Sequence, residues 1–301
     1  MKVHTRRECP RRVCPGSRHA DKSTDGDVSE YCQAVFMKPH SSLHERLSTR
    51  RVLIGLMQTY PNPVLAEMAG MCGYDFVIVD DEHGVFGEID HVQALRALDS
   101  VNALALVRLA GHDLRAVGRY LDIGADVIVA PNVTTAEQAR ALVRAMVYPP
   151  AGTRGFGASG HRATRYGMDL AAHLKAPREG VSLVVIIESA LGVANVEDIL
   201  AVDGVDGAII GPWDLTADLG CAGDFSQPQY AQAVARIEQA AVARGKLLGT
   251  GPHPGNPLEA LVARGHRLLV IGGDMPLIRE AMNAQVSQAR SCLSPRAGLQ
   301  A

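Results

Sequence analysis

From Leu53 onward, short apolar runs alternate with longer stretches in which apolar residues recur at helical spacing. The runs are continuous and rich in Val, Ile and Leu, which is typical of strands that a parallel sheet buries on both faces. We expect eight strands, at Leu53–Met57, Asp75–Val79, Leu104–Arg108, Asp126–Ala130, Leu183–Ile187, Gly207–Ile210, Lys246–Gly249 and Leu268–Ile271. The alternation therefore predicts a series of β/α units.

The stretches between these runs carry the start and stop signals of helices. The clearest helical patterns are Ala136–Val147 and Gln229–Arg244. Start signals are Asn62-Pro63 for the first helix, Thr134 and Thr135 with Glu137 for the fourth, and Ser226-Gln227-Pro228 after the sixth strand. Glycines that would end a helix in the left-handed conformation precede five strands, at Gly73, Gly124, Gly204, Gly245 and Gly265.

Eight β/α units within about 250 residues have the size of a (β/α)₈ TIM barrel. The alternative within the α/β class is an open doubly wound sheet, which usually carries a glycine-rich dinucleotide turn after its first strand. Here the first strand is followed by Gln58-Thr59-Tyr60-Pro61, which has no such pattern. We therefore expect a (β/α)₈ barrel over residues 41–292, followed by a short C-terminal tail, residues 293–301.

Residues 1–40 differ from the rest of the chain, because they are rich in Arg, Cys, Pro, Ser and Asp. They contain no apolar segment of the kind that a secretory signal requires. Pro10 and Pro15 argue against the amphipathic helix of a transit peptide. We expect a disordered extension, or a start codon assigned too early with Met37 as the true start.

Composition narrows the range of partners. The chain has 301 residues, of which 47% are hydrophobic, and a formal net charge of −2. This charge gives no basic field for nucleic acid, and no apolar run has the length of a membrane span. The six scattered cysteines form no CxxC pair, which favours free thiols in a reducing compartment. We expect a cytoplasmic protein with a small-molecule partner, and neither nucleic acid nor membrane.

Ionisable residues follow four of the apolar runs, at the strand ends where barrel active sites lie. The second run leads into Asp80 and His83, the third ends in Arg108, and the fifth and sixth lead into Glu188 and Asp214. A carboxylate that emerges from a nearly dry core needs a partner. Two hard carboxylate ligands suit Mg²⁺ or Mn²⁺ and leave positions open for water and substrate. The sequence therefore predicts a metal site at Glu188 and Asp214.

The same residues fit enolate chemistry on a 2-oxo acid, which can chelate a metal through its carboxylate and keto oxygens. Arg108 could bind the carboxylate or the enolate oxygen. His83 could transfer protons near neutral pH, with Asp80 or Asp122 orienting its ring. Structural interpretations exist as well: Arg108 could be a buried ion-pair partner of Asp80, His83 a loop histidine, and Asp214 the cap of a short helix over residues 215–219.

Three further acids can be interpreted from their positions in helices. Asp81 and Glu82 fit a helix N-cap and first-turn charges better than catalysts. Asp122 comes at the end of a helix, where an acid is electrostatically disfavoured, and this indicates a specific partner.

A long segment without regular structure, Tyr148–Asp169, is predicted before the fifth strand. It carries Arg154, His161, Arg162 and Arg165 among five glycines. Segments of this length are usually functional. It could bind an anionic substrate, also through a glycine-rich anion nest, or reach a neighbouring subunit. The alternative is a disordered basic lid.

Six motifs, in order, resemble the 4-hydroxy-2-oxoheptanedioate aldolase family, which groups with 2-dehydro-3-deoxyglucarate aldolases, macrophomate synthase and citrate lyase β-like proteins. The resemblance covers roughly residues 53–282 and rests on Val79-Asp80-Asp81-Glu82-His83, Leu106-Val107-Arg108, Leu121-Asp122-Ile123-Gly124-Ala125, Tyr148-Pro149-Pro150 with Gly152 and Arg154-Gly155, Ile187-Glu188-Ser189, and Gly211-Pro212 with Asp214-Leu215.

The resemblance implies a class II pyruvate or oxaloacetate aldolase on a phosphoenolpyruvate-type barrel. The family's metal ligands match Glu188 and Asp214, and its enolate-binding arginine matches Arg108. Its catalytic histidine matches His83, and the acids that support this histidine match Asp80 and Asp122. The backbone that faces the substrate carboxylate matches Gly211, Pro212 and Trp213. We also expect substrate contacts from Ser189, Arg154 and Arg162. The metal is expected to be Mg²⁺, with Mn²⁺ or Co²⁺ as alternatives. The family exchanges its eighth helix between subunits and forms dimers assembled into hexamers, which implies a homo-oligomer.

Some positions depart from the family's pattern. Ile186 stands where the aldolases usually carry Gln. The acidic motif reads Asp-Asp-Glu-His, and the stretch Ser159–Arg162 differs from the usual aldolase sequence. Three hypotheses follow. The first is cleavage of a 4-hydroxy-2-oxo acid to pyruvate and an aldehyde. The second is condensation of oxaloacetate with acetyl-CoA to citrate, as in siderophore biosynthesis; Ile186, the basic loop and Gly249-Thr250-Gly251 favour such a changed acceptor site. The third is a non-catalytic barrel that binds a 2-oxo acid.

Overall fold

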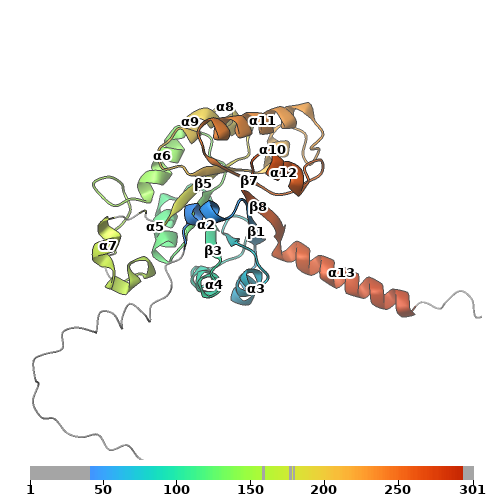
Figure 1. The fold of residues 1–301 in the computed structure, drawn as a ribbon, viewed down its shortest axis with the longest axis horizontal. Helices are drawn as coiled ribbons and strands as arrows, with labels where there is room; N and C mark the ends of the chain where they lie inside the picture. Colours follow the sequence, from blue (N-terminus) through green and yellow to red (C-terminus); the bar gives the residue numbers. More distant parts are fainter. Residues whose placement is uncertain (1–40, 158–159, 176–177, 179, 294–301) are drawn as a thin grey trace, which may run out of the picture. The chain divides into compact units, whose positions relative to one another are not determined.

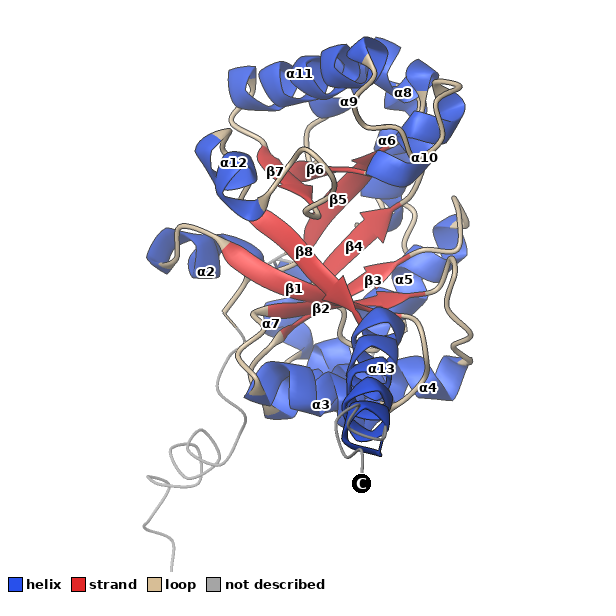
Figure 2. Cartoon of the chain, turned by 90° about the vertical axis from the view of Figure 1, so that its right-hand side faces the viewer, coloured by secondary structure: helices blue, strands red, loops and turns tan. Residues whose placement is uncertain are grey.

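The computed structural model describes residues 41–157, 160–175, 178 and 180–293. Eight parallel strands form a closed barrel in which each strand pairs with the next and β8 pairs with β1 (Figure 2). The strands are β1 (Leu53–Gln58), β2 (Phe76–Asp80), β3 (Leu104–Arg108), β4 (Val127–Ala130), β5 (Ser182–Ile187), β6 (Gly207–Ile210), β7 (Leu247–Thr250) and β8 (Leu268–Gly273). The predicted (β/α)₈ barrel is confirmed, and the strand ends differ from the expected ones by at most two residues.

Helices follow the strands and surround the barrel (Figures 1 and 2). They are α2 (Leu43–Thr49), α3 (Pro63–Met71), α4 (Glu88–Ser100), α5 (Leu114–Asp122), α6 (Ala136–Ala145), the 3₁₀ helix η1 (Arg162–Gly167), α7 (Leu170–Lys175), α8 (Ala190–Ala194), α9 (Val196–Leu200), α10 (Pro212–Asp218), α11 (Pro228–Ala243), α12 (Leu258–Ala263) and α13 (Asp274–Leu293). In the part of the chain that the structure describes, none of these helices combines the length and apolar character needed to cross a membrane.

The predicted helix signals are found with one correction. The Asn62 side chain accepts the Val64 N–H at the start of α3, as expected. At α6 the capping box joins Thr135 to Gln138, and not to Glu137, whose side chain instead pairs with Arg140. The third position of the helix is the one whose side chain can return to the N-cap backbone. The five glycines before strands all have positive φ, between 63° and 100°.

The core has two layers, because successive side chains of a strand point to opposite faces. One layer lies between the strands and the surrounding helices. The other fills the barrel itself and includes Phe76, Ile78 and Ile186. Leu43 and Leu47 of α2 belong to this inner cluster and are buried. Helix α2 therefore covers the N-terminal end of the barrel and leaves the C-terminal end open.

Helix α13 has a different environment from the other long helices. Asp274 accepts the N–H groups of Thr59 and Tyr60 at 3.0 and 2.9 Å, which attaches the start of α13 to the segment after β1. Asp274 is also the only buried residue of the twenty in α13. Figure 1 shows the rest of the helix projecting away from the barrel. Its apolar side chains are therefore uncovered in a single chain.

The three cysteines of the described ranges, Cys72, Cys221 and Cys292, are free, as expected. The predicted extension, residues 1–40, and all of the predicted tail except Leu293 lie outside the described residues.

A candidate active site at the C-terminal rim

The ends of β2 and β3 place an aspartate and an arginine side by side. Asp80 and Arg108 are paired in the strand register. The Arg108 Nε and Nη2 atoms donate to the two carboxylate oxygens of Asp80, each at 2.7 Å, and Asp80 is fully buried. Such a two-pronged pair fixes the plane of the guanidinium. Arg108 is thus an ion-pair partner of Asp80 and, at the same time, part of a cavity wall.

The segment after β2 carries the predicted catalytic histidine. Asp80 Oδ1 accepts the backbone N–H groups of Glu82 and His83, at 3.0 and 3.4 Å. The His83 side chain is 64% exposed and lies in the cavity lining, and its Nε2 is 3.9 Å from the Glu82 carboxylate. The ring therefore has Glu82 as its acidic neighbour, whereas Asp80 holds the backbone of the segment.

The interpretation of Asp81 and Glu82 as helix-start residues is wrong. Helix α4 begins at Glu88, with Gly87 as its N-cap. Glu82 instead lies 3.1 Å from Arg108 Nη1. Because burial outweighs the attraction of Arg108, the pKa of Glu82 is raised. Sequence reasoning missed this residue, although it lies directly before His83 in the acidic motif.

Glu188 emerges from the end of β5 into a tight space. Its Oε1 accepts the Asn132 N–H at 2.7 Å, and the residue is 7% exposed. Asn132 has a φ of 44°, in the left-handed region that Asn tolerates better than most residues. A Cβ on Gly211 would lie 2.3 Å from Glu188 Oε2 and 2.8 Å from the Glu188 Cβ, which cannot move aside, so position 211 favours glycine. Asn132 was not predicted as a site residue. Its position directly after β4, at the end of the barrel where active sites lie, could have identified it.

Electrostatics at Glu188 favour a positive partner. Burial raises the pKa of Glu188 to about 7, opposed by the Asn132 N–H and reinforced by the charges of Asp214 and Glu82. Asp214 lies exposed in the first turn of α10, and Gly211, not Asp214, is the N-cap, so the capping interpretation of Asp214 is wrong. Of the four carboxylates at this rim, Asp80 and Glu82 pair with Arg108, whereas Glu188 and Asp214 have no ion pair with it.

These residues share one cavity of about 860 Å³. Its polar lining includes His83, Arg108, Glu188, Gly211, Pro212, Trp213 and Asp214, and its apolar lining includes Met57, Ile78, Val129, Ile186, Ile209 and Val270. Among the described residues, no group of three His, Cys, Asp or Glu side chains is arranged to hold a metal. Two carboxylates beside an open cavity fit a cation that takes its other ligands from water and substrate.

Of two further predicted substrate contacts, Ser189 has a structural role and Trp213 lies at the cavity. The Ser189 Oγ accepts the Gly192 N–H at 3.2 Å and caps α8. Trp213 is 62% exposed, and its ring packs edge-on against Phe225 at 5.0 Å between centroids. Trp213 lies in the cavity wall, whereas the hydroxyl of Ser189 is engaged within its own helix.

Asp122, Arg154 and Arg162 are not brought to this rim. Asp122 ends α5, and the segment that carries both arginines connects α6 to β5, so all three lie at the N-terminal end of the barrel. Arg154 Nη2 donates to Asp122 at 2.6 Å, and Arg162 pairs with Asp99 at the end of α4. The expectation that Asp122 orients His83 within one chain is therefore wrong: helices and strands run in opposite directions, so a helix end lies at the far end of the barrel.

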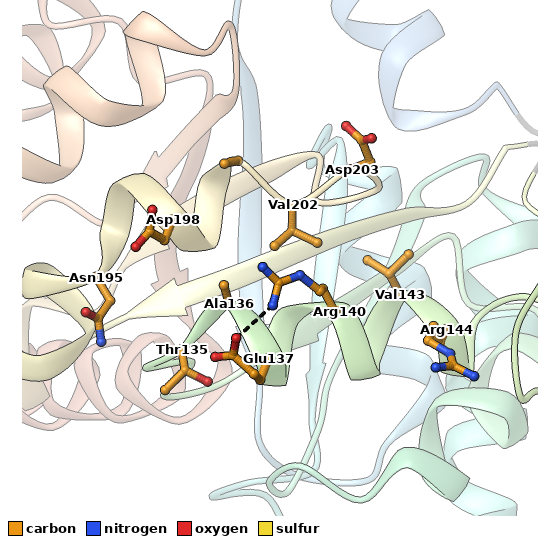
Figure 3. Close-up of a pocket in the computed structure, with 11 residues that line it drawn as sticks. Thr135, Ala136, Glu137, Arg140, Val143, Arg144, Asn195, Asp198, Val202 and Asp203 are labelled. Atoms are coloured by element: carbon orange, nitrogen blue, oxygen red, sulfur yellow. Dashed lines mark hydrogen bonds and ion pairs between the residues drawn. The ribbon is translucent and has the colours of Figure 1, made fainter.

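A second cavity, of about 800 Å³, lies on the outer wall between α6 and α9 (Figure 3). Its walls carry Arg140, Arg144 and Asp198, and Glu137 and Arg140 pair at 2.8 Å. None of the predicted catalytic or metal-binding residues lines it. The cavity at the C-terminal rim is therefore the candidate active site.

The barrel is similar to known proteins over most of its length. Residues 54–281 match the family model described as HpcH/HpaI aldolase/citrate lyase. A hydroxypyruvate/pyruvate aldolase from Delftia acidovorans is 35% identical over 253 residues, which cover 84% of this chain and 94% of that protein.

Two solved structures share the fold over most of their length. A HpcH/HpaI aldolase/citrate lyase family protein from Burkholderia cenocepacia J2315 has a TM-score of 0.77 at 30% identity, covering 82% of this chain and 98% of its own. The citrate synthase SbnG has a TM-score of 0.76 at 25% identity, covering 84% and 99%. The resemblance inferred from six sequence motifs is thus confirmed, and the chain belongs to the HpcH/HpaI aldolase/citrate lyase family.

Proposed function

We propose that the protein is a divalent-metal-dependent aldolase that cleaves a 4-hydroxy-2-oxo acid to pyruvate and an aldehyde through a pyruvate-type enolate. The observation that carries this proposal is the convergence of Glu188, Asp214 and Arg108 on one cavity. The similarity to a hydroxypyruvate/pyruvate aldolase supports the same class of chemistry.

Glu188 and Asp214 would hold the metal. The excess of carboxylates over guanidinium groups, and the burial that raises the pKa of Glu188, both favour a cation between them. When bound, a divalent ion supplies Lewis-acid polarisation of the 2-oxo group. We favour Mg²⁺ because both ligands are hard carboxylates, with Mn²⁺ or Co²⁺ as alternatives.

Arg108 would bind the oxygen on which negative charge develops. Asp80 occupies its Nε and Nη2, which fixes the plane of the guanidinium in the cavity wall. His83, in the cavity lining with Glu82 as its neighbour, would accept the proton of the 4-hydroxyl group as the C3–C4 bond breaks and would then deliver a proton to C3 of the enolate to give pyruvate. Gly211, Pro212 and Trp213 line the wall next to Glu188, which supports their assignment to the substrate carboxylate.

The second candidate is condensation of oxaloacetate with acetyl-CoA to citrate. The favouring observation is Ile186, which is buried in the cavity wall two residues before Glu188 and offers no polar contact there. The similarity to the citrate synthase SbnG agrees with this alternative. Both candidates share the enolate-forming half of the reaction and differ in the electrophile.

One set of incubations separates the candidates. The purified protein with Mg²⁺ is given pyruvate plus simple aldehydes and, separately, oxaloacetate with and without acetyl-CoA. An aldol product supports the proposed function, and citrate with release of free thiol supports the second candidate. Pyruvate binding without turnover in any mixture would instead show a non-catalytic barrel.

We further propose a homo-oligomer in which α13 packs on a second copy of the chain. Leu277, Met282 and Val286 are 43%, 61% and 49% exposed on a helix whose only buried residue is Asp274. Uncovered apolar side chains on one long helix favour burial in an interface. Light scattering on the full chain and on a chain ending at residue 275 tests this: the truncated chain should lose the assembly.

A substrate contact from Arg154 or Arg162, or a catalytic role of Asp122, stays a prediction that requires such an assembly. The N-terminal end of one barrel would have to meet the C-terminal rim of another.

A further inference from the structure

The segment between β2 and α4, residues 81–87, is anchored by Asp81 on the side away from the cavity. Asp81 Oδ2 accepts the hydroxyl of Tyr120 at 2.5 Å, and its backbone N–H donates to the Arg108 carbonyl at 3.0 Å. Its other carboxylate oxygen, Oδ1, lies 3.6 Å from His91 Nε2. One residue of this segment is thus connected to α5, β3 and α4.

His91 is built into this arrangement. It is 2% exposed, with Phe86 and Tyr120 on either side at 5.2 and 4.9 Å between ring centroids. Its Nδ1 lies 2.9 Å from the Gly87 carbonyl, which can only accept, so Nδ1 carries a proton. Its buried Nε2 has no hydrogen-bond partner among the described residues and faces Asp81.

Tyr120 is a donor throughout the neutral range. Burial, together with the bond to Asp81, raises the pKa of Tyr120, so the phenol keeps its proton. Tyr120 is 8% exposed, and a hydrogen bond from a buried hydroxyl to a carboxylate is directional. The Asp81 side chain is therefore held in one position.

The residues on either side of Asp81 connect this anchor to the site. Asp80 points inward to Arg108, and Glu82 also reaches Arg108. The Asp81 carboxylate instead points toward α5 and α4, where it contacts Tyr120 and His91. We propose that Asp81, held by the Tyr120 hydroxyl beside the buried His91 ring, is a positioning residue that fixes this segment so that Glu82 and His83 face Arg108 and the cavity. This inference deepens the proposed function and rests on it.

The test compares Tyr120→Phe and Asp81→Ala with a matched control, Tyr148→Phe. Tyr148 is also buried, and its hydroxyl bonds a histidine, His173, at the N-terminal end of the barrel. The measurement is exchange of the pyruvate methyl protons for deuterium with Mg²⁺ present, followed by NMR. We expect kcat to fall roughly tenfold to a hundredfold in Tyr120→Phe and Asp81→Ala, because small misplacements of catalytic groups have effects of this size. The KM for pyruvate should stay within about twofold.

Further variants separate positioning from general stability. Asp81→Asn keeps an oxygen that can accept the Tyr120 hydroxyl and should recover most of the exchange rate. The double variant Tyr120→Phe/Asp81→Ala should be no slower than the worse single variant, since both changes break the same contact. A Tyr120→Phe rate equal to that of wild type or of Tyr148→Phe would overturn the proposal, as would a rise in KM alone.

A wild-type protein that does not exchange pyruvate protons would contradict the proposed function but not the positioning role of Asp81. The anchor is then tested by hydrogen–deuterium exchange of the backbone amides of residues 81–87. Faster amide exchange in Tyr120→Phe than in both wild type and Tyr148→Phe supports it, and unchanged amide exchange overturns it.

Discussion

Two arginine–aspartate pairs lie at opposite ends of this barrel, and their surroundings differ. At the C-terminal rim, Arg108 and Asp80 border a cavity that also contains Glu188 and Asp214. At the N-terminal end, Arg154 pairs with Asp122, stacks over the Tyr148 ring at 4.8 Å and lines neither of the two cavities described above. Similar residue pairs thus border the candidate site at one end and form a packing element at the other.

The difference teaches that charge alone does not mark a site in this fold. What distinguishes the C-terminal rim is an excess of carboxylates around an open space, whereas the acid at the N-terminal end is neutralised by its own arginine. Substitutions at the two ends should therefore have different effects on activity and stability.

The largest effect should come from removing either proposed metal ligand. Glu188→Gln and Asp214→Asn keep the side-chain shape and remove the charge, so metal dependence and activity should be lost together. A metal contributes several kcal/mol to stabilising developing charge, which corresponds to a loss of roughly a thousandfold or more in kcat. Steady-state kinetics with metal titration measure this, and full activity in either variant would rule out the metal assignment.

The two arginines give the direct comparison. Arg108→Lys cannot make the two-pronged bond to Asp80, and kcat/KM should fall about a hundredfold, as when one donor to a developing oxyanion is removed. Arg154→Lys should instead lower the free energy of unfolding by about 2 kcal/mol, less than for a fully buried pair because Asp122 is partly exposed. Its kcat/KM should stay within about threefold of wild type. Kinetics and urea unfolding measure both; a loss of activity in Arg154→Lys equal to that of Arg108→Lys would place the N-terminal end in another subunit's site.

His83→Ala should slow proton transfer and leave pyruvate binding largely intact, because the ring is mostly exposed. General acid–base catalysis contributes about a hundredfold or more, so kcat for aldol cleavage should fall by that order. Calorimetric titration with pyruvate checks binding. Unfolding of this variant would show that the ring has a structural role.

The smallest effect is a dependence of metal binding on pH. Because the pKa of Glu188 is raised from 4.5 to about 7, a proton occupies this carboxylate below pH 7 and competes with the metal. Mg²⁺ affinity should fall roughly tenfold per pH unit below 7. Calorimetric titration of wild type with Mg²⁺ between pH 5 and 8 measures this, and an affinity that stays constant over this range would contradict it.

The same shift has a defined sign for stability. The folded chain binds the Glu188 proton more tightly than the unfolded chain, so stability without metal decreases as the pH rises from 4.5 to about 7. The loss of stability then stays constant above pH 7, and bound metal should remove it. Thermal unfolding of wild type and Glu188→Gln between pH 5 and 8 measures the difference.

Much of this protein could be predicted from local sequence alone. Continuous apolar runs produced all eight strands, because a strand buried on both faces cannot carry polar residues in its interior. Asn62 and the glycines before the strands act through their own backbone, so they were predicted too. The convergence of Arg108, Glu188 and Asp214 followed from topology, since parallel strands in a barrel all end at the same rim.

Tertiary structure decided which charges belong to that rim. Glu82 belongs to the site because it contacts Arg108, 26 positions away, and Asn132 because it contacts Glu188, 56 positions away. No local sequence pattern contains such contacts. Asp122, Arg154 and Arg162 lie away from that rim, because each helix returns the chain to the opposite end of the barrel before the next strand. Hydrophobic periodicity thus determines elements and their order, whereas partners among charged side chains depend on distances that exist only after the barrel closes.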